Sequence, residues 1–377
     1  MLTFIIFIII LGILIFVHEF GHFIVARRNG VKAEEFGFGF PPRAIGMVYV
    51  DKTKKWKIIK GNKEVESNNT IYSLNWVPFG GFVRIKGEGG DHSKDADSLA
   101  SKSAWIRFKV FVAGVTMNFI LAWLLLIVLL IMGVNQEIGQ EDASVTGAKI
   151  QVAAVVPKSP AYEMDLREGD TLLKCVGSDA RCEQNFSNIS ELQSFIADHK
   201  GQQITLEISR GDKVLDLIGT PRTVAPQGEG LLGIEMAQTK FVRYSLWAAI
   251  KQSPIYMWNI LVMMGMVLRD LFTGNAKDIG GPVAVIHFTK QAAALGLSSL
   301  IQLTALLSLN LAIVNFLPIP ALDGGHILFV IIEKIKGSPV NRNVENWIHT
   351  AGFFLLMALM VYMIIHDISR YGLGGIF

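Results

Sequence analysis

Charge is scarce in this 377-residue chain, and it is missing from the first long segment. Asp, Glu, Lys and Arg make up 18% of the residues, hydrophobic residues make up 51%, and the mean hydropathy is +0.41. From Leu2 to Val17 no charged residue occurs. This composition excludes an ordinary soluble enzyme and predicts a membrane helix bundle that carries at least one soluble module.

The same apolar segment lacks the marks of a cleaved signal peptide. No basic residue precedes it, and no small-residue cleavage site follows it. We therefore expect residues 1–27 to be retained as a membrane-spanning helix.

Cysteine is nearly absent too, since Cys175 and Cys182 are the two in the chain. No matching histidine lies near them in the sequence, which argues against a catalytic thiol. A disulfide that closes a hairpin, in an oxidising compartment, and two free buried thiols are both compatible with their spacing.

A zinc-type motif stands inside the first apolar segment, where His18-Glu19-Phe20-Gly21-His22 spell HExxH. On a helix the two histidines lie at i and i+4 on one face, the spacing at which two imidazoles share one zinc ion, and Glu19 lies beside the metal as a general base. Because ionisable groups at bilayer depth are costly, their presence there indicates a functional site.

Three more apolar runs are long enough to cross a bilayer. They cover residues 108–134, 297–332 and 344–368. The run 247–272 is interrupted by Lys251 and Pro254, and we interpret residues 241–296 as an interfacial helical linker. If the run 247–272 lies on the outer surface, HExxH and Asp323 fall at the same depth in the membrane, so we expect four spans with both termini outside.

The distribution of charge predicts the orientation of the spans. Residues 27–107 carry 15 Lys/Arg and 9 Asp/Glu, whereas residues 135–239 carry 9 Lys/Arg and 16 Asp/Glu. Basic loops stay in the cytoplasm, so we expect the first loop inside and the central region outside.

Both regions show strand patterns. Residues 135–240 predict a compact α/β module, with strands at 148–156 and 172–176, a helix at 189–199, and a hairpin formed by 204–209 and 214–218 around Gly211-Asp212.

Residues 28–107 predict a membrane-associated β-rich loop. Within it, 72–86 reads as a β-hairpin, and its Gly80-Gly81-Phe82 segment is either a packed hairpin or an edge that pairs with an extended substrate.

A second motif, NxxPxPxLDGG, runs from Asn315 to Gly325. Together with HExxH in the first span it resembles the signature of the site-2 proteases, which are intramembrane zinc metalloproteases.

The segments Ser159-Pro160-Ala161 and 166–170 (LREGD) resemble a PDZ domain. The whole chain is similar to the bacterial regulator of sigma-E protease type. The expected fold is a polytopic α-helical membrane protein with four transmembrane helices, one inserted extracytoplasmic PDZ-like α/β domain and a membrane-associated β-hairpin region.

The resemblance implies a role for each motif residue. His18, His22 and Asp323 would bind Zn²⁺, Glu19 would be the catalytic base, and Asn315 would hold the substrate. His326 is a competitor for the third ligand by residue type. Val115 stands where the family usually has proline, and the chain has room for one PDZ domain where some relatives have two. The groove of that domain is expected between the helix 189–199 and the strand 231–236.

The implied activity is zinc-dependent endoproteolysis inside the bacterial cytoplasmic (inner) membrane, with the active site toward the cytoplasm. The expected substrates are single-span membrane proteins, such as anti-sigma factors or signal-peptide remnants, after a first protease has removed their external part. The lipid bilayer is an expected partner and nucleic acid is not. The competing hypothesis is a non-catalytic PDZ scaffold with a structural metal site, and the presence of both Glu19 and Asp323 argues against it.

Overall fold

The structure, a computed structural model, describes residues 2–51, 53–63, 65, 67–137, 148–177, 182, 185–186, 188–211, 213–273, 280–338 and 340–372. Its contacts divide the chain into two compact units. Unit 1 contains Met1–Leu126, Ser253–Lys290 and Gln302–Phe377, and unit 2 contains Ile127–Gln252 and Gln291–Ile301. Each unit is described by itself.

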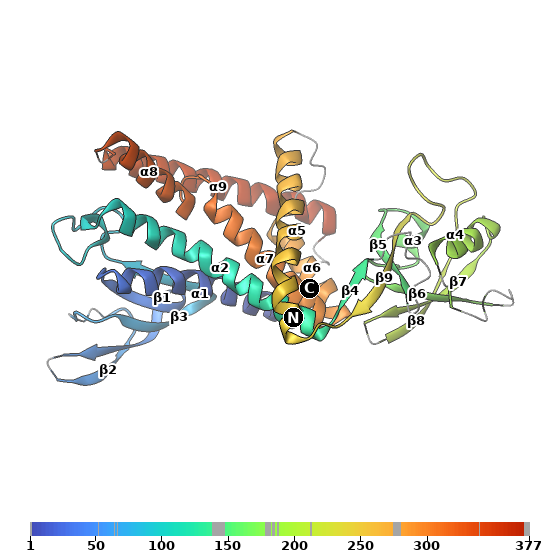
Figure 1. Cartoon of the computed structure of the whole chain (residues 1–377), viewed down its shortest axis with the longest axis horizontal. Coiled ribbons are helices and arrows are strands. Elements are labelled where there is room, and N and C mark those ends of the chain that lie inside the picture. The colour runs from blue at the N-terminus through green and yellow to red at the C-terminus, as the bar shows by residue number, and fades with distance from the viewer. Residues whose placement is uncertain are drawn as a thin grey trace. The chain divides into compact units, whose positions relative to one another are not determined.

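Unit 1 is a bundle of long helices with a small sheet packed beside it (Figure 1). The helices that lie wholly or mostly in it are α1 (Leu2–Arg28), α2 (Ala104–Met132), α5 (Leu246–Phe272), α6 (Pro282–Leu295), α7 (Leu297–Phe316), α8 (Asp323–Lys336) and α9 (Arg342–Tyr371). A 3-10 turn, η1 (Leu99–Ser101), precedes α2.

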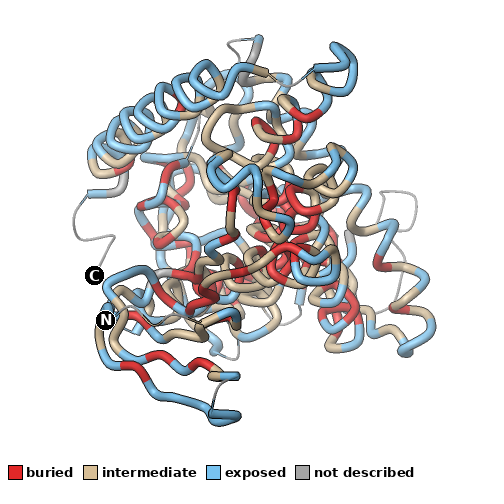
Figure 2. Tube along the Cα trace, turned by 90° about the vertical axis from the view of Figure 1, so that its left-hand side faces the viewer, coloured by how far each residue is buried: buried red, intermediate tan, exposed pale blue. Residues whose placement is uncertain are grey.

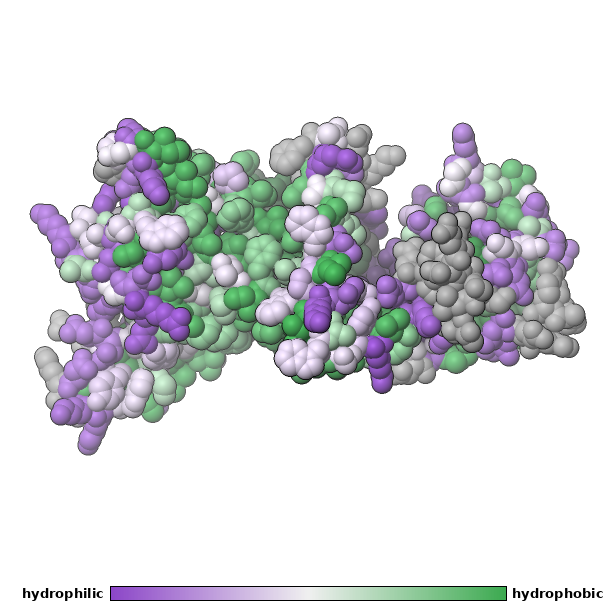
Figure 3. Space-filling model, in the orientation of Figure 1, coloured by the Kyte–Doolittle hydropathy of each residue, from purple (hydrophilic) through white to green (hydrophobic). Residues whose placement is uncertain are grey.

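Four helices in the described part of the chain are long and apolar enough to cross a membrane: α1, α2, α7 and α9. Hydrophobic residues cover much of unit 1, and hydrophilic ones gather at the end that carries β2 (Figure 3). Buried residues are red in Figure 2, where long stretches of helix stay pale blue. Exposed apolar surface on this scale suits helices that are surrounded by lipid.

The expected third span is two helices. α7 ends at Phe316 and α8 begins at Asp323. Pro318 and Pro320 lie in the connection, and because proline lacks a backbone N–H and clashes with the preceding helical turn, the helix cannot continue through them. The connection of residues 317–322 therefore has non-helical backbone at membrane depth.

α5 lies across α2 and α7 in Figure 1 instead of along them. Pro254 is inside α5, near its start. This direction agrees with an interfacial helix, and the membrane depth of residues 241–296 stays a prediction.

The expected hairpin at residues 72–86 is instead one long strand of a three-stranded sheet. Strands β1 (Ala33–Val50), β2 (Lys55–Lys60) and β3 (Ile71–Ile85) pair antiparallel in the order β2-β1-β3. Both halves of β3 pair with β1, so Phe36 faces Tyr72 on one side and Val83 on the other. β3 turns back at Gly80, whose φ of +78° suits glycine. The second half of β3 is thereby an edge that lies beside α1.

Unit 2 is built on a six-stranded antiparallel sheet in the order β4-β9-β5-β6-β7-β8. Its strands are β4 (Val134–Glu137), β5 (Lys149–Val155), β6 (Thr171–Val176), β7 (Ile204–Arg210), β8 (Lys213–Gly219) and β9 (Ile234–Val242), and its short helices are α3 (Pro160–Glu163) and α4 (Ile189–Asp198). The strands expected at 148–156 and 172–176, the hairpin and the helix all agree with these elements; Asp212 of the expected turn lies outside the described residues.

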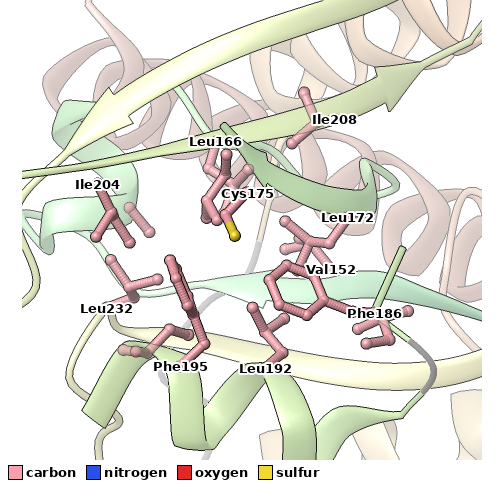
Figure 4. Close-up of a cluster of buried hydrophobic side chains, with 14 of the residues drawn as sticks. Val152, Leu166, Leu172, Cys175, Phe186, Leu192, Phe195, Ile204, Ile208 and Leu232 are labelled. Atoms are coloured by element: carbon pink, nitrogen blue, oxygen red, sulfur yellow. The ribbon is translucent and has the colours of Figure 1, made fainter. Parts of the chain in front are cut away.

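The core of unit 2 forms between this sheet and α4 (Figure 4). Leu192 and Phe195 of α4 pack toward Val152, Leu172 and Cys175 of the sheet. α4 is amphipathic and begins at Asn188, whose side chain accepts a hydrogen bond from Glu191 N. A disulfide joins Cys175 to Cys182, which decides between the two alternatives that the sequence leaves open.

We expect the sheet of unit 1 to lose stability in acid because of one buried ion pair. Arg43 donates two hydrogen bonds to Glu35, from Nε at 2.8 Å and Nη2 at 2.6 Å. Burial, the largest single cause, raises the pKa of Glu35, but hydrogen bonding together with the positive charges of Arg43 and Arg84 outweighs burial and holds that pKa below its ordinary value of 4.5. The carboxylate therefore contributes stability above pH 4.5, and the contribution is lost as the pH falls through the lowered pKa.

Hydrogen exchange of β1 and β3 amides between pH 3 and 7 measures this effect, with Glu35→Gln as the control. The variant should be less stable at neutral pH and should lack this pH dependence. Identical pH profiles for both proteins would contradict the prediction.

Candidate metal centre

Two buried imidazoles converge on one face of α1. His18 and His22 are each 6% exposed, and their Nε2 atoms lie 3.2 Å apart. The helix forms because the segment around them is uncharged and apolar, so its backbone must satisfy its own hydrogen bonds in lipid. The i, i+4 spacing predicted from the sequence thus brings both ring nitrogens to one point.

Asp323, the first residue of α8, completes a set of three ligand atoms. Its Oδ2 lies 2.9 Å from His18 Nε2 and 3.3 Å from His22 Nε2. Ligand atoms bound to one zinc ion at about 2.0–2.1 Å and tetrahedral angles lie about 3.3 Å apart. The three separations fit one zinc ion, and two neutral imidazoles with one carboxylate form a ligand set typical of catalytic zinc, which keeps a fourth position open.

A glycine of α2 leaves the space that the ion would need. A Cβ at Gly114 would lie 2.2 Å from His22 Nε2 and 2.7 Å from His18 Cε1. On α1, a Cβ at Gly21 would lie 2.5 Å from the Ala113 carbonyl oxygen. Glycines at both positions let the two helix backbones approach closely at the level of the ligands.

The outer nitrogens of both imidazoles have partners on α2. His22 Nδ1 lies 2.8 Å from the Val110 carbonyl oxygen, which can only accept, so this ring carries its proton on Nδ1 and leaves Nε2 free for a metal. The Asn118 carboxamide lies against His18 Nδ1, with its nitrogen 3.1 Å away. Its Oδ1 is buried without a hydrogen-bond partner, and exchanging the two ends of the amide lets Oδ1 accept the Nδ1 proton.

Glu19 lies between the histidine pair and β3. Its Oε2 accepts a hydrogen bond of 3.1 Å from Val83 N, on the edge half of that strand. Glu19 also lines a cavity of about 290 Å³ together with His18, Asn315 and Asp323. A carboxylate beside the ligands and open to this cavity is placed to exchange a proton with water there.

Asn315, near the end of α7, reaches the same cavity. Its Nδ2 lies 3.4 Å from His18 Nε2. α7 is held to α2 nearby, because Ser308 Oγ donates a hydrogen bond of 2.8 Å to the Asn118 carbonyl oxygen. The sequence-predicted residues His18, Glu19, His22, Asn315 and Asp323 are therefore brought together by α1, α7 and α8.

Gly80 and Gly81 lie close to α1, and neither they nor Phe82 line the cavity. A Cβ at Gly80 would lie 2.7 Å from Ile15 Cδ1, and one at Gly81 would lie 2.9 Å from the Gly37 carbonyl oxygen. Their small size lets β3 pass between β1 and α1. The backbone contact with Glu19 comes from the N–H of Val83, one residue after Phe82.

His326 does not join the three ligand atoms and instead lies near Glu345 and His349. These three residues could also hold a metal by type. The backbone N–H of Ala321, however, donates a hydrogen bond of 3.0 Å to His349 Nδ1. Since Nδ1 accepts, the neutral ring carries its proton on Nε2 and offers no free nitrogen to a metal. The geometry therefore favours the first set as the zinc site.

Comparison with known proteins agrees with this geometry. The model of peptidase family M50 matches residues 6–359. The chain belongs to peptidase family M50, the site-2 proteases. A Clostridium perfringens protein named as a candidate zinc metalloprotease is 35% identical, over 94% of this chain and 95% of its own.

Two relatives that carry the name RasP are similar over their full length. The zinc metalloprotease RasP of Geobacillus kaustophilus is 27% identical, over 97% of each chain. The regulator of sigma-W protease RasP of Bacillus subtilis is 27% identical, over 98% of each chain. This M50 peptidase is accordingly a multi-pass membrane zinc metalloprotease of the site-2 type.

The structure adds residues that the motifs do not mark. Gly114, Asn118 and the Val110 carbonyl all come from α2 and surround the histidine pair. From its sequence alone, a polar residue such as Asn118 in an apolar run predicts a hydrogen bond between helices, whereas the structure places it against His18. An uncharged polar residue and a glycine in an apolar helix were the available signals, and neither reveals which helix lies opposite.

Replacing Gly114 with alanine should remove zinc while the bundle still forms. The added methyl group would occupy the space between the two imidazoles, so the zinc content should fall from about one ion per chain to less than about a tenth of that. Elemental analysis of the purified full-length protein measures the change.

Gly265→Ala is the matched control, because nothing lies within 4 Å of a Cβ at that position of α5. A Gly114→Ala protein that binds zinc as the control does would show that the metal lies elsewhere.

Proposed function

We propose that this M50 peptidase hydrolyses peptide bonds of single-span membrane proteins within the bilayer, after another protease has removed most of their external part. The observation that carries the proposal is the convergence of His18, His22 and Asp323 beside Glu19, in a cavity between helices that are long and apolar enough to span a membrane. A water-using site at this depth serves a substrate that is itself in the membrane.

In this proposal His18, His22 and Asp323 hold zinc, and Glu19 is the general base. When bound, zinc polarises a carbonyl group and makes water more acidic. A Glu19 carboxylate oxygen takes a proton from the attacking water and gives it to the amide nitrogen of the leaving segment. The hydrogen bond from Val83 N fixes the direction of this carboxylate.

The substrate is positioned by Asn315 and by the edge of β3. A helical substrate has its amides bonded internally and must unwind before it is cut. The edge half of β3 lies beside Glu19 and can pair with an unwound segment, which replaces the lost hydrogen bonds. The Asn315 amide faces the ligands and can donate a hydrogen bond to the substrate carbonyl.

Charge and disulfide chemistry support an orientation with the active site toward the cytoplasm and unit 2 outside. α1 ends in Arg27 and Arg28 and continues into a basic loop, as expected for a cytoplasmic side. The Cys175–Cys182 disulfide of unit 2 requires an oxidising compartment, which lies outside the cytoplasmic membrane of a bacterium.

Unit 2 is proposed to act as a PDZ-like domain on the substrate's external end. β9 begins at Ile234, directly after Leu231-Leu232-Gly233, and α4 packs near this strand. A groove between a helix and a strand edge captures an extended peptide by strand addition. The Bacillus subtilis relative is named a regulator of sigma-W protease, and we propose anti-sigma factor-like proteins and signal-peptide remnants as substrates here.

Glu19→Gln should abolish cleavage and leave zinc binding intact. Glutamine keeps the shape of the side chain but cannot accept a proton, so the rate should fall by about 10²–10⁴-fold. The assay is cleavage, by purified protein in liposomes, of a single-span model substrate with a very short external tail.

The same substrate with a folded external domain should be cut far more slowly by the wild-type protein.

Glu163→Gln, an exposed substitution on α3 of unit 2, is the control and should cleave as the wild type does. Equal cleavage by Glu19→Gln would rule out Glu19 as the base. Fast cleavage of the substrate with the folded domain would rule out the requirement for a prior cut.

A further inference from the structure

The backbone that carries Asp323 contains a strained position. Ala321 has a φ of +72°, in the left-handed region that a residue with a side chain rarely adopts. Asp323 follows two residues later and places its Oδ2 between the two imidazoles. Such a conformation is strained and persists only where the surroundings hold it.

The hydrogen bonds of the connection show where that support comes from. Within residues 317–322, all of which the structure describes, Pro318 and Pro320 have no N–H. The N–H groups of Leu317, Ile319 and Leu322 bond to carbonyls of α7 or of the connection itself. Ala321 N instead donates to His349 Nδ1 of α9, at 3.0 Å.

α9 is also in direct contact with the connection at its next turn. A Cβ at Gly352 would lie 2.4 Å from Pro320 Cβ and 2.9 Å from the Pro320 carbonyl oxygen. Gly325 of α8 is also close to the connection, since a Cβ there would lie 2.7 Å from the Ile319 carbonyl oxygen. The connection is thus fitted between α8 and α9 with no space for a side chain at either glycine.

The ring of His349 is itself fixed in place. It stacks on His326 with a centroid separation of 3.9 Å and an interplanar angle of 15°, and His326 in turn stacks on Phe111 at 4.8 Å. Glu345 Oε1, one turn before His349 on α9, lies 3.8 Å from His326 Nδ1. The stack defines the direction in which His349 Nδ1 points.

We propose that His349 is a positioning residue for the zinc site: by accepting the Ala321 N–H it holds the 317–322 connection in the conformation that brings Asp323 to His18 and His22. The inference rests on the proposed role of Asp323 as a ligand. Losing the acceptor would leave the part-buried N–H of the strained Ala321 unpaired, and the connection would relax away from the histidine pair.

Asparagine and leucine at position 349 test the effect of the hydrogen-bond acceptor separately from the effect of side-chain shape. Asn Oδ1 occupies the place of His Nδ1, and leucine has nearly the same shape with a methyl group there. Zinc release to an excess of chelator is followed for the full-length protein in detergent. His349→Asn should release zinc as the wild type does, whereas His349→Leu should release it about 10–100-fold faster.

The visible absorption of the cobalt-substituted protein gives a second readout, because it reports the geometry of the ligands without turnover. His349→Leu should change this spectrum and His349→Asn should restore it. Phe354→Leu, at an exposed position of α9, controls for a general effect on this helix and should match the wild type in both measurements.

Each outcome bears on the inference. Equal zinc release and spectra for the asparagine and leucine variants would overturn it, whether both match the wild type or both differ. If His349→Leu fails to fold, as thermal unfolding of the zinc-free protein would show, His349→Gln replaces it. Its acceptor sits where Nε2 is, so it should lose zinc faster than His349→Asn, and equal rates would overturn the inference.

Asp323→Asn distinguishes this inference from the proposed function. If that variant keeps zinc and the wild-type cobalt spectrum, Asp323 is not a ligand and the proposed site fails. If it loses zinc while both His349 variants behave as the wild type, the ligand assignment stands and the positioning role alone is wrong.

Discussion

Polar ligands have to meet at a depth where hydrocarbon gives them no hydration. An ionised carboxylate is costly to bury unless it is paired or binds a metal. Here one carboxylate oxygen of Asp323 lies between two imidazole nitrogens, at 2.9 and 3.3 Å. This contact joins the first helix to a segment about 300 residues later. Beside it, Gly21 and Gly114 let α1 and α2 approach closely.

The same contact explains why a membrane-spanning segment is broken. A continuous helix through residues 297–332 would satisfy its own backbone but would offer no exposed peptide groups and little space for water. The two prolines end α7 and start a connection whose remaining N–H groups need other partners. Irregular backbone at membrane depth is tolerated where protein or a wet cavity surrounds it, and both conditions hold beside Asp323.

In the proposed mechanism, the small sheet of unit 1 holds an extended substrate segment. β3 folds around β1, so that its second half becomes an edge next to α1 and its Val83 N–H reaches Glu19. The strand edge and the carboxylate proposed as the base are therefore in direct contact. In unit 2, β9 lies next to α4 and between β4 and β5, and the disulfide suits the oxidising side of the membrane.

The sequence by itself determined the elements whose signals are local. Uncharged runs defined the four apolar helices, and HExxH placed two imidazoles on one helix face. Residues 297–332 were expected as one span, although Pro318 and Pro320 exclude a continuous helix through them. The tertiary structure decided which segments meet. That Asp323 and not His326 reaches the histidines, that Asn118 and Gly114 surround them, and that β3 pairs twice with β1 instead of forming a hairpin all depend on contacts between distant parts of the chain. Contacts between distant segments leave no periodicity in the sequence. A glycine, asparagine or histidine in an apolar segment indicates close packing against another part of the chain, but the sequence does not show which part.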